Sequence, residues 1–279
     1  YIMPHDFMPG LAGVPAATSS ISDVDGQRGI LEYRGIRVET LCADSSYLET
    51  AYLLLFGHLP SADEFQQWTT DVTRHRRIKF RIIDLLKCLP EQGHPMDALQ
   101  AAVAALGMFY PGRHVKDVEN NYWSAVRLVA KLPTIVAAWA RLRHGDDPIP
   151  PRDDLGFSEN FLYMLTESVA PSVWADIFDD CLILHAEHTM NASTFTGLVT
   201  ASTLADPYTV VASSIGALKG PLHGGANEEV VVMLREIGTA EKARPYVERV
   251  LQNKKKLMGF GHRIYTVKDP RATVLQELC

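Results

Sequence analysis

Hydrophobic residues recur at helical spacing along most of the chain, whereas the first forty residues alternate between polar and apolar positions. Alternating stretches border Asp25-Gly26 and flank Arg34-Gly35. Asp-Gly between alternating stretches is typical of a hairpin, because both turn residues tolerate a positive φ angle. We therefore expect one small β element near the N-terminus and no second one.

The rest of the chain carries start and stop signals for helices. Ser46 with Glu49, and Ser61 with Glu64, have the spacing of capping boxes. Gly57 follows the apolar stretch 47–56 and supplies a stop. Further helices are expected at 97–108, 133–143, 171–188, 228–237 and 240–254. Prolines and acids predict a loop at 145–154.

The expected helix at 171–188 carries one apolar stripe. Trp174, Ile177, Cys181, Leu184 and His188 follow 3-4-3-4 spacing and so share a face. His188 is therefore expected to be buried on this stripe. Together the patterns predict an all-α protein with a small N-terminal β element.

Composition narrows the class of protein. A chain of 279 residues with 47% hydrophobic residues can bury a core and is not disordered. No apolar stretch spans a bilayer, and the printed N-terminus lacks a signal-peptide pattern. A net charge of −6 argues against nucleic acid, and four widely separated cysteines encode neither a zinc knuckle nor a disulfide framework. We expect a soluble cytoplasmic enzyme with no membrane or nucleic-acid partner.

The segment 220–228, Gly-Pro-Leu-His-Gly-Gly-Ala-Asn-Glu, places His223 on a glycine-rich turn before a helix. Glycines allow another molecule to approach the backbone closely. A helix N-terminus lowers the pKa of a nearby histidine, and a neutral imidazole can donate to a carbonyl oxygen that is becoming negative. A plain interhelical turn with an exposed histidine is the alternative.

A second histidine follows glycines in the segment 258–265, and an Asp-Pro-Arg turn ends at Arg271. Arginine presents a planar fork that suits a carboxylate substrate. The alternative is a loop in which Arg271 caps a helix or pairs with Asp269.

The third segment, 185–193, contains His185 and His188. A lone buried histidine is usually a satisfied core residue rather than a ligand. The two histidines could hold zinc, but no HExxH pattern or further ligand cluster accompanies them. The sequence also lacks a Walker loop and a GxGxxG motif after a strand. We expect no metal.

Two basic clusters remain. The cluster Arg74–Arg81 is expected to be a solvated or subunit-contacting helix face, with anion binding as the alternative. Lys254, Lys255 and Lys256 are also expected to be solvated, but they precede the loop of His262, where a phosphate-bearing ligand would find them.

The three histidine segments, in this order and at these separations, resemble the citrate synthase family. The likeness extends over nearly the whole chain and includes Gly10-Leu11-Ala12-Gly13-Val14, His94-Pro95-Met96-Asp97 and Asn160-Phe161-Leu162-Tyr163-Met164-Leu165. The resemblance is to the short bacterial form, which lacks the N-terminal β-domain of some relatives. It implies an all-α homodimer, or a higher oligomer, with a large helical domain at 1–222 and the start of a small domain at 223–279.

The resemblance also assigns roles. His223 would hydrogen-bond the thioester carbonyl and stabilise the enol of acetyl-CoA, and His262 would act as general acid on the oxaloacetate carbonyl. His188, Asn191 and Arg271 would bind oxaloacetate. The coenzyme A site would be lined by Leu257, Met258, Gly259 and Gly261. No cofactor is bound permanently in this scheme, because acetyl-CoA is a co-substrate.

One departure from the family concerns the base. The family's catalytic aspartate, which removes the methyl proton, falls beyond Cys279, and no earlier Asp can be assigned this role. The chain as printed is therefore expected to be inactive alone. One alternative is 2-methylcitrate synthase, which uses propionyl-CoA; the extra methyl group of this substrate changes only the volume of the pocket. Another alternative is a truncated, non-catalytic assembly form. A metal hydrolase built on His185 and His188 is a more distant alternative.

Overall fold

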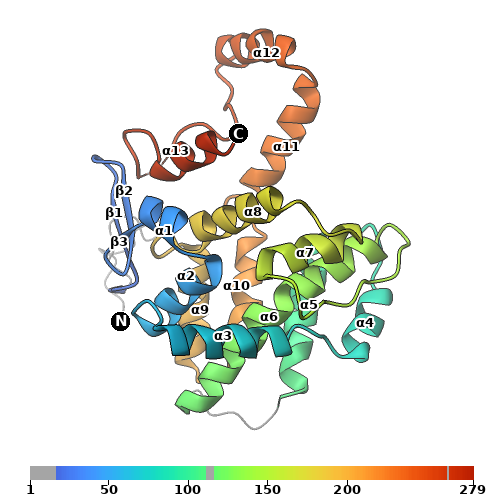
Figure 1. Ribbon diagram of the computed structural model, residues 1–279. Helices are drawn as coiled ribbons and strands as arrows, with labels where there is room; N and C mark the ends of the chain where they lie inside the picture. The colour runs from blue at the N-terminus through green and yellow to red at the C-terminus, as the bar shows by residue number, and fades with distance from the viewer. Residues whose placement is uncertain (1–16, 111–115, 263) are drawn as a thin grey trace, which may run out of the picture.

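The computed structural model describes residues 17–110, 116–262 and 264–279. Helices dominate this part of the chain, and the three short strands lie together at one side (Figure 1). The all-α prediction is confirmed, while the Gly10–Val14 motif lies outside the described residues. The helices are α1 (Val38–Asp44), α2 (Tyr47–Phe56), α3 (Ala62–Arg74), α4 (Phe80–Lys87), α5 (Pro95–Met108), α6 (Val118–Leu142), α7 (Phe157–Thr166), α8 (Ser172–His185), α9 (Ala192–Ser202), α10 (Pro207–Leu218), α11 (Ala226–Ile237), α12 (Ala240–Gln252) and α13 (Pro270–Glu277).

The N-terminal sheet contains β1 (Ser22–Asp25), β2 (Ile30–Tyr33) and β3 (Ile36–Arg37), paired antiparallel in that order. The Arg34-Gly35 turn is as predicted, because φ is 50° at Arg34 and 83° at Gly35. The reason given for Gly26 was wrong, since the left-handed residue of the first turn is Gly29, with φ 66°. Gly26 is a glycine for another reason, which concerns the site.

The two capping boxes are confirmed. Ser46 and Glu49 exchange side-chain and backbone hydrogen bonds at the start of α2, and Ser61 and Glu64 do the same for α3. Gly57 ends α2 in the left-handed conformation, with φ 94°. These local signals depend on backbone groups that a helix terminus leaves without intrahelical partners, which is why the sequence alone locates them.

The helix predicted to begin at Pro133 begins much earlier. In the structure α6 starts after Asp117, whose side chain accepts from the backbone N–H groups of Glu119 and Asn120, and it continues through Pro133. Proline is common in a first helical turn, but here it lies inside the helix. The helix continues because Ala130 on one side of the proline and residues such as Ile135 on the other are fully packed in the core.

Three clusters of buried side chains hold the body together. One joins α4, α5, α6 and α10, a second joins α2, α3 and α6, and a third packs the sheet against α1, α2 and α8. In the third cluster, Leu31 and Tyr33 of β2 and Ile183 of α8 have no exposed surface. The sheet is therefore fixed against the end of α8, where the histidine segment 185–193 begins.

The predicted stripe on α8 is only partly correct. Leu184 is buried, but Trp174 is 60% exposed. The helix ends at His185, so His188 lies in the turn that follows and not on the stripe. The cause is tertiary, because the hydroxyl of Tyr33 donates to the carbonyl of Ile183, 3.0 Å away, and accepts from the N–H of Glu187 at 3.3 Å.

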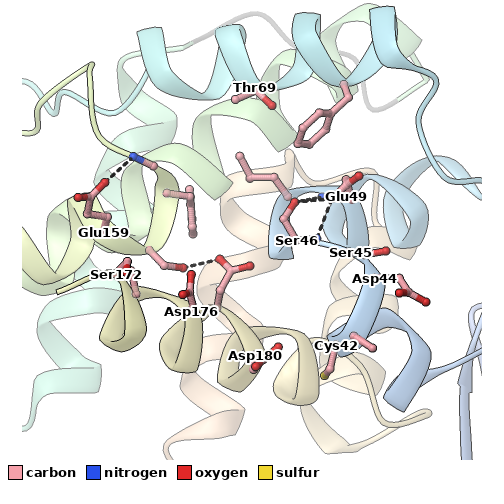
Figure 2. Close-up of a pocket in the computed structure, with 18 residues that line it drawn as sticks. Cys42, Asp44, Ser45, Ser46, Glu49, Thr69, Glu159, Ser172, Asp176 and Asp180 are labelled. Carbon is pink, nitrogen blue, oxygen red and sulfur yellow. Dashed lines mark hydrogen bonds between the residues drawn. The ribbon is translucent and has the colours of Figure 1, made fainter. Parts of the chain in front are cut away.

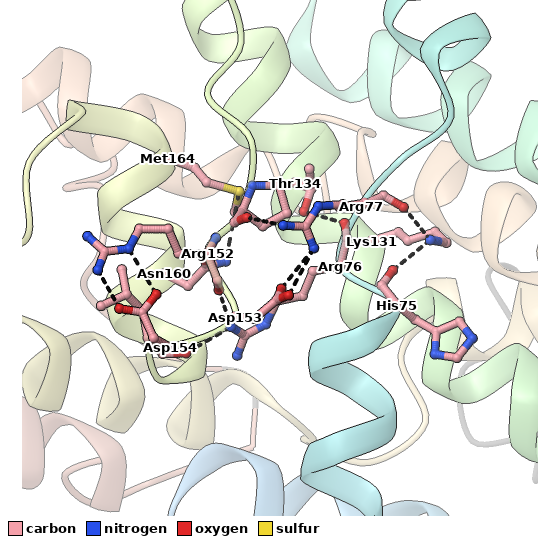
Figure 3. Close-up of polar contacts among 12 residues, drawn as sticks. His75, Arg76, Arg77, Lys131, Thr134, Arg152, Asp153, Asp154, Asn160 and Met164 are labelled. Carbon is pink, nitrogen blue, oxygen red and sulfur yellow. Dashed lines mark hydrogen bonds and ion pairs between the residues drawn. The ribbon is translucent and has the colours of Figure 1, made fainter.

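The basic cluster Arg74–Arg81 is not one helix face. It spans the end of α3, the link and the start of α4, and Arg76 in the link is 2% exposed (Figure 3). Its guanidinium donates to the carbonyls of Arg152 and Leu155, at 2.9 and 2.8 Å. Lys131 of α6 donates to two carbonyls of the link, and burial beside Lys79 and Arg127 lowers its pKa to about 8. The loop predicted at 145–154 is confirmed, and Arg76 holds its end in place.

Helices α11 and α12 extend from the body, and α13 returns to lie beside α1 (Figure 1). Helices α11 and α12 begin at Ala226 and Ala240, close to the predicted starts, and α12 ends at Gln252. The three lysines that follow are exposed, as expected. In the described part of the chain, no helix has the length and apolar character needed to cross a membrane.

Candidate active site

Two of the predicted histidines meet in space. The rings of His188 and His262 are 5.4 Å apart between centroids, and both contact the ring of Tyr265. The Nε2 atom of His188 is 3.2 Å from the hydroxyl oxygen of Tyr265. Tyr265 is 4% exposed, and burial together with Asp269 raises its pKa to about 12, so the hydroxyl keeps its proton.

The backbone determines which nitrogen of His262 carries the proton. Its Nδ1 atom accepts from the N–H groups of Ile264 and Tyr265, at 3.0 and 3.1 Å. The neutral ring therefore has its proton on Nε2, which lies 3.9 Å from a carboxylate oxygen of Asp269. A ring fixed in this tautomer can give the Nε2 proton to a substrate oxygen.

Arg271 lies in the first turn of α13 and pairs with Asp269, the residue that caps this helix. The guanidinium donates to both carboxylate oxygens, at 3.0 and 2.7 Å. Burial opposes ionisation of Asp269, but the hydrogen bonds and charge of Arg271 hold its pKa below the usual value. The pairing with Asp269, which was the alternative from the sequence, is therefore present, and it fixes the orientation of the guanidinium beside the histidines.

His188 is neutral at pH 7. Burial is the main cause, and the positive charge of Arg271 and the ring of His262 add to it, so that the pKa falls to about 4. A neutral imidazole beside a fixed guanidinium can hydrogen-bond a carboxylate or a carbonyl without protonation changes near pH 7.

His223 lies in the turn between α10 and α11, apart from this cluster. Its Nε2 atom is 2.7 Å from the hydroxyl oxygen of Ser193 in the first turn of α9. When Ser193 donates to Nε2, the neutral ring carries its proton on Nδ1 and can offer it to a carbonyl. Among the described residues, no hydrogen bond or ion pair joins His223 to His262.

The glycines after His223 have a different purpose from the one expected. A Cβ atom on Gly224 would lie 2.4 Å from the carbonyl oxygen of Leu218, and one on Gly225 would lie 2.9 Å from the Cα of Pro221. The close approach is thus made by the chain's own backbone, which folds back under His223. The glycines set the position of the histidine.

The other predicted site residues are Asn191 and those of the segment 257–261. Asn191 is exposed and caps α9, with its side-chain oxygen accepting from the N–H of Thr194 at 2.9 Å. Gly259 and Gly261 adopt positive φ angles of 79° and 87°, and these angles let the backbone of the segment 257–261 turn just before His262. Leu257 and Met258 are partly buried there.

A cavity of about 670 Å³ lies elsewhere, between α2 and α8 (Figure 2). Its wall includes Glu49, Asp176 and Asp180, together with Cys42, and it contains none of the predicted site residues. Burial next to neighbouring aspartates raises the pKa of Asp180. An acidic wall repels a dicarboxylate, so this cavity does not compete with the histidine cluster as the substrate site.

A metal was not expected, and the zinc alternative based on His185 finds no support. His185 is exposed and its Nδ1 atom contacts the carbonyl of Cys181 at 2.6 Å. The described residues bring together one set of possible ligands, His188, His262 and Asp269. The carboxylate of that set is already paired with Arg271, and a bound cation would be repelled by this guanidinium.

The sequence did not identify Tyr265 and Ser193 as contacts of the histidines, or Tyr33 as a contact of the turn that carries His188. Tyr265 and Ser193 stand within segments that were singled out, but their residue types carry no distinctive chemistry there. Tyr33 is 150 residues from Ile183, whose carbonyl it holds. Only tertiary contact places these hydroxyl groups beside the site.

Comparison with known proteins gives consistent matches. The family described as citrate synthase, C-terminal domain, matches residues 10–279. A citrate synthase of Synechocystis sp. is 60% identical over 272 residues, which are 98% of this chain and 68% of that protein. A citrate synthase of Acidithiobacillus ferridurans is 49% identical over 278 residues, with 98% of this chain and 72% of that protein covered.

The fold agrees with a solved structure. The crystal structure of citrate synthase from Pyrobaculum aerophilum superposes with a TM-score of 0.90 at 44% identity, covering 98% of this chain and 70% of that chain. Sequence and fold comparisons therefore point to the same kind of protein.

Proposed function

Because the chain belongs to the citrate synthase family, we propose that it condenses acetyl-CoA with oxaloacetate and that water then hydrolyses the thioester, which gives citrate and coenzyme A. The observation that carries the proposal is the cluster of neutral His188, His262 with its proton on Nε2, and Arg271. A dicarboxylate with a reactive ketone needs a fixed cation, a neutral hydrogen-bonding group and a proton donor, which these residues supply.

In this mechanism oxaloacetate binds between the histidines. Arg271 pairs with one carboxylate of the substrate, and His188 hydrogen-bonds the substrate beside it. His262 holds the ketone oxygen through Nε2–H and transfers this proton as the new carbon–carbon bond forms. The imidazolate left by this transfer then takes a proton from solvent and returns to the neutral form with Nε2–H.

His223 acts on the other substrate. With Ser193 donating to Nε2, the Nδ1–H group of His223 stabilises the developing enolate oxygen of acetyl-CoA. The methyl proton passes to a carboxylate base, which in the family is an aspartate and is assigned to no residue of this chain. The segment 257–261 is proposed to line the coenzyme A site, and the glycines at 259 and 261 leave its backbone accessible. Asn191 is proposed to orient substrate from the start of α9 while it caps that helix.

We further propose that the chain divides into a large domain at 1–222 and a small domain that begins at His223. The support is that α11 and α12 contact each other and extend from the body of α1–α10 (Figure 1). Movement of α11 and α12 on the body would bring His223 and its acyl-CoA towards the histidine cluster, whose His262 segment and α13 stay packed on the sheet and on α1, and would exclude water.

A homodimer is also proposed. Helices α5 and α6 pack part of their apolar residues within the protomer, against α4 and α10. Exposed apolar surface lies on α8 and α9, where Val173, Trp174, Leu198 and Val199 are 43 to 60% exposed. Light scattering at micromolar concentration tests the proposal, and a stable monomer would contradict it.

Turnover is tested with the protein encoded by the complete gene. Thiol release is followed with oxaloacetate and either acetyl-CoA or propionyl-CoA. Faster turnover with acetyl-CoA supports the proposal, whereas faster turnover with propionyl-CoA assigns 2-methylcitrate synthase and no release supports a non-catalytic form. A cytoplasmic location and a place in the tricarboxylic acid cycle stay predictions, checked by fractionation and by the metabolite changes in a deletion strain.

The two histidine roles are separated by proton exchange. His223→Ala should suppress exchange of acetyl methyl protons into solvent. His262→Ala should weaken oxaloacetate binding and block condensation, while keeping more of the exchange when a dicarboxylate analogue closes the site. Each variant should lose about 10²-fold or more in turnover. If His223→Ala exchanges the acetyl methyl protons at the wild-type rate while His262→Ala does not, the assigned roles are reversed.

A further inference from the structure

The N-terminal sheet contacts both segments that carry the histidine cluster. One contact is to the turn of His188. The hydroxyl of Ser22 in β1 donates to the carboxylate of Glu187 at 3.1 Å and accepts from the N–H of Thr189 at 3.1 Å. These two partners stand immediately before and after His188. The hydroxyl of Tyr33 in β2 also accepts from the N–H of Glu187, so side chains of the sheet contact the residues on both sides of His188.

The backbone at this turn requires such support. Thr189 has a φ angle of 64°, in the left-handed region that a β-branched residue rarely adopts. A conformation of this kind persists only where its surroundings determine it. The hydrogen bond from its N–H to the hydroxyl of Ser22 fixes it to the sheet.

The other contact is to the segment of His262. The carbonyl of Gly26, in the turn between β1 and β2, accepts from the N–H of Thr266 at 2.9 Å and from its hydroxyl at 3.3 Å. The carbonyl of Ile264 passes so close that a Cβ atom on Gly26 would lie 2.1 Å from its oxygen. Gly29 in the same turn is likewise crowded by Val267 and Lys268.

This close approach explains why residue 26 is a glycine. Gly26 is not among the residues with positive φ, so its conformation is open to other amino acids. What excludes a side chain is the peptide of Ile264. The N–H of that residue and the N–H of Tyr265 are the two groups that fix the tautomer of His262. A shift at Gly26 is therefore passed directly to the general acid.

We propose that the N-terminal sheet is a positioning element for the oxaloacetate site, with Gly26 and Ser22 as positioning residues that hold the His262 and His188 segments in register. The two segments meet at Tyr265, which contacts both rings, so their relative position depends on the sheet that anchors each of them. The inference rests on the proposed function for its kinetic readout but not for its structural one.

The main test replaces Gly26 with alanine in the protein from the complete gene. The carbonyl of Ile264 must then move by about 1 Å, and a displacement of this size next to reacting groups costs up to about 10²-fold in rate. Gly26→Ala should lower kcat/KM for oxaloacetate about 10- to 100-fold while KM for acetyl-CoA changes less than threefold. Gly156→Ala is the control, because a Cβ atom there meets nothing within 4 Å and φ is −56°.

Ser22 provides a second, milder test in case Gly26→Ala fails to fold. Ser22→Ala removes both hydrogen bonds to the His188 turn and should raise KM for oxaloacetate about 3- to 10-fold (an effect of one or two hydrogen bonds). Ser22→Thr keeps the hydroxyl and should restore the wild-type value. Folded Gly26→Ala or Ser22→Ala protein with wild-type kinetics for oxaloacetate would overturn the proposal.

A spectroscopic readout separates this inference from the proposed function. The ¹⁵N resonances of the His262 ring report which nitrogen carries the proton, whether or not the enzyme turns over. Gly26→Ala should move these resonances away from the Nε2–H form, and Gly156→Ala should not. Wild-type protein without thiol release would refute the proposed function alone, whereas unchanged ring resonances in Gly26→Ala would refute the positioning role alone.

Discussion

Two adjacent arginines, Arg76 and Arg77, are expected to differ strongly in their contribution to stability. Arg76 is 2% exposed and donates to the carbonyls of Arg152 and Leu155. The side chain of Arg77 is 58% exposed and pairs with Asp153 at 2.9 Å (Figure 3). The paired variants Arg76→Met and Arg77→Met remove each guanidinium and keep most of the aliphatic volume.

The magnitude follows from what each change leaves behind. Arg76→Met leaves two carbonyls without a donor in a buried place, at about 1–3 kcal/mol each, and the buried methionine returns about 1–2 kcal/mol. The free energy of unfolding should therefore fall by about 1–4 kcal/mol. Arg77→Met removes an exposed ion pair, which is worth about 0–1 kcal/mol.

Urea unfolding followed by circular dichroism measures both variants. All samples are kept at one protein concentration, because association of subunits would shift the apparent stability. The midpoint and the slope together give the change in free energy of unfolding. A loss below about 1 kcal/mol in Arg76→Met, or an equal loss in Arg77→Met, would refute the claim that Arg76 holds the 145–154 loop in place.

Other expected outcomes concern the site. The pKa of His188 falls from 6.5 unfolded to about 4 folded, so the unfolded state binds more protons in this window and stability is lost as pH falls from about 6.5 to 4. The full shift is worth about 3 kcal/mol, and about half of this is expected because the ring is half-buried. A melting temperature that depends less on pH in His188→Gln would confirm this contribution, and an unchanged pH dependence would contradict it. Gly224→Ala should destabilise the fold by about 1–3 kcal/mol in calorimetry, because its Cβ would meet the carbonyl of Leu218 at 2.4 Å, and an unchanged melt would show that the turn yields freely. Ser193→Ala should lower kcat about tenfold by freeing the ring of His223, with Ser193→Thr as the control, and equal rates in both would remove Ser193 from the mechanism.

Much of the fold is encoded locally and could be predicted from the sequence. The capping boxes at Ser46 and Ser61 satisfy helix-terminal N–H groups within three residues, so no distant contact is needed to recognise them. The Arg34-Gly35 turn and the loop at 145–154 are of the same kind. The all-α class follows from helical periodicity, and the family follows from three specific histidine motifs.

Tertiary contacts decided the features that local patterns predicted wrongly. Helix α8 stops at His185 because Tyr33, far away in the chain, takes its terminal groups. Pro133 lies within a helix because the residues on both sides of it are buried. In each case the free energy of long-range burial or of a buried hydrogen bond exceeds the local preference.

The site divides in the same way. The sequence singled out His188, His223, His262 and Arg271 as candidates, and the resemblance of their motifs to the citrate synthase family supplied the roles predicted for them. Only the folded chain brings His188 and His262 within 5.4 Å, fixes the proton of His262 and lowers the pKa of His188. Tautomer and pKa depend on the groups that surround a ring in space, and these come from segments that the sequence leaves far apart.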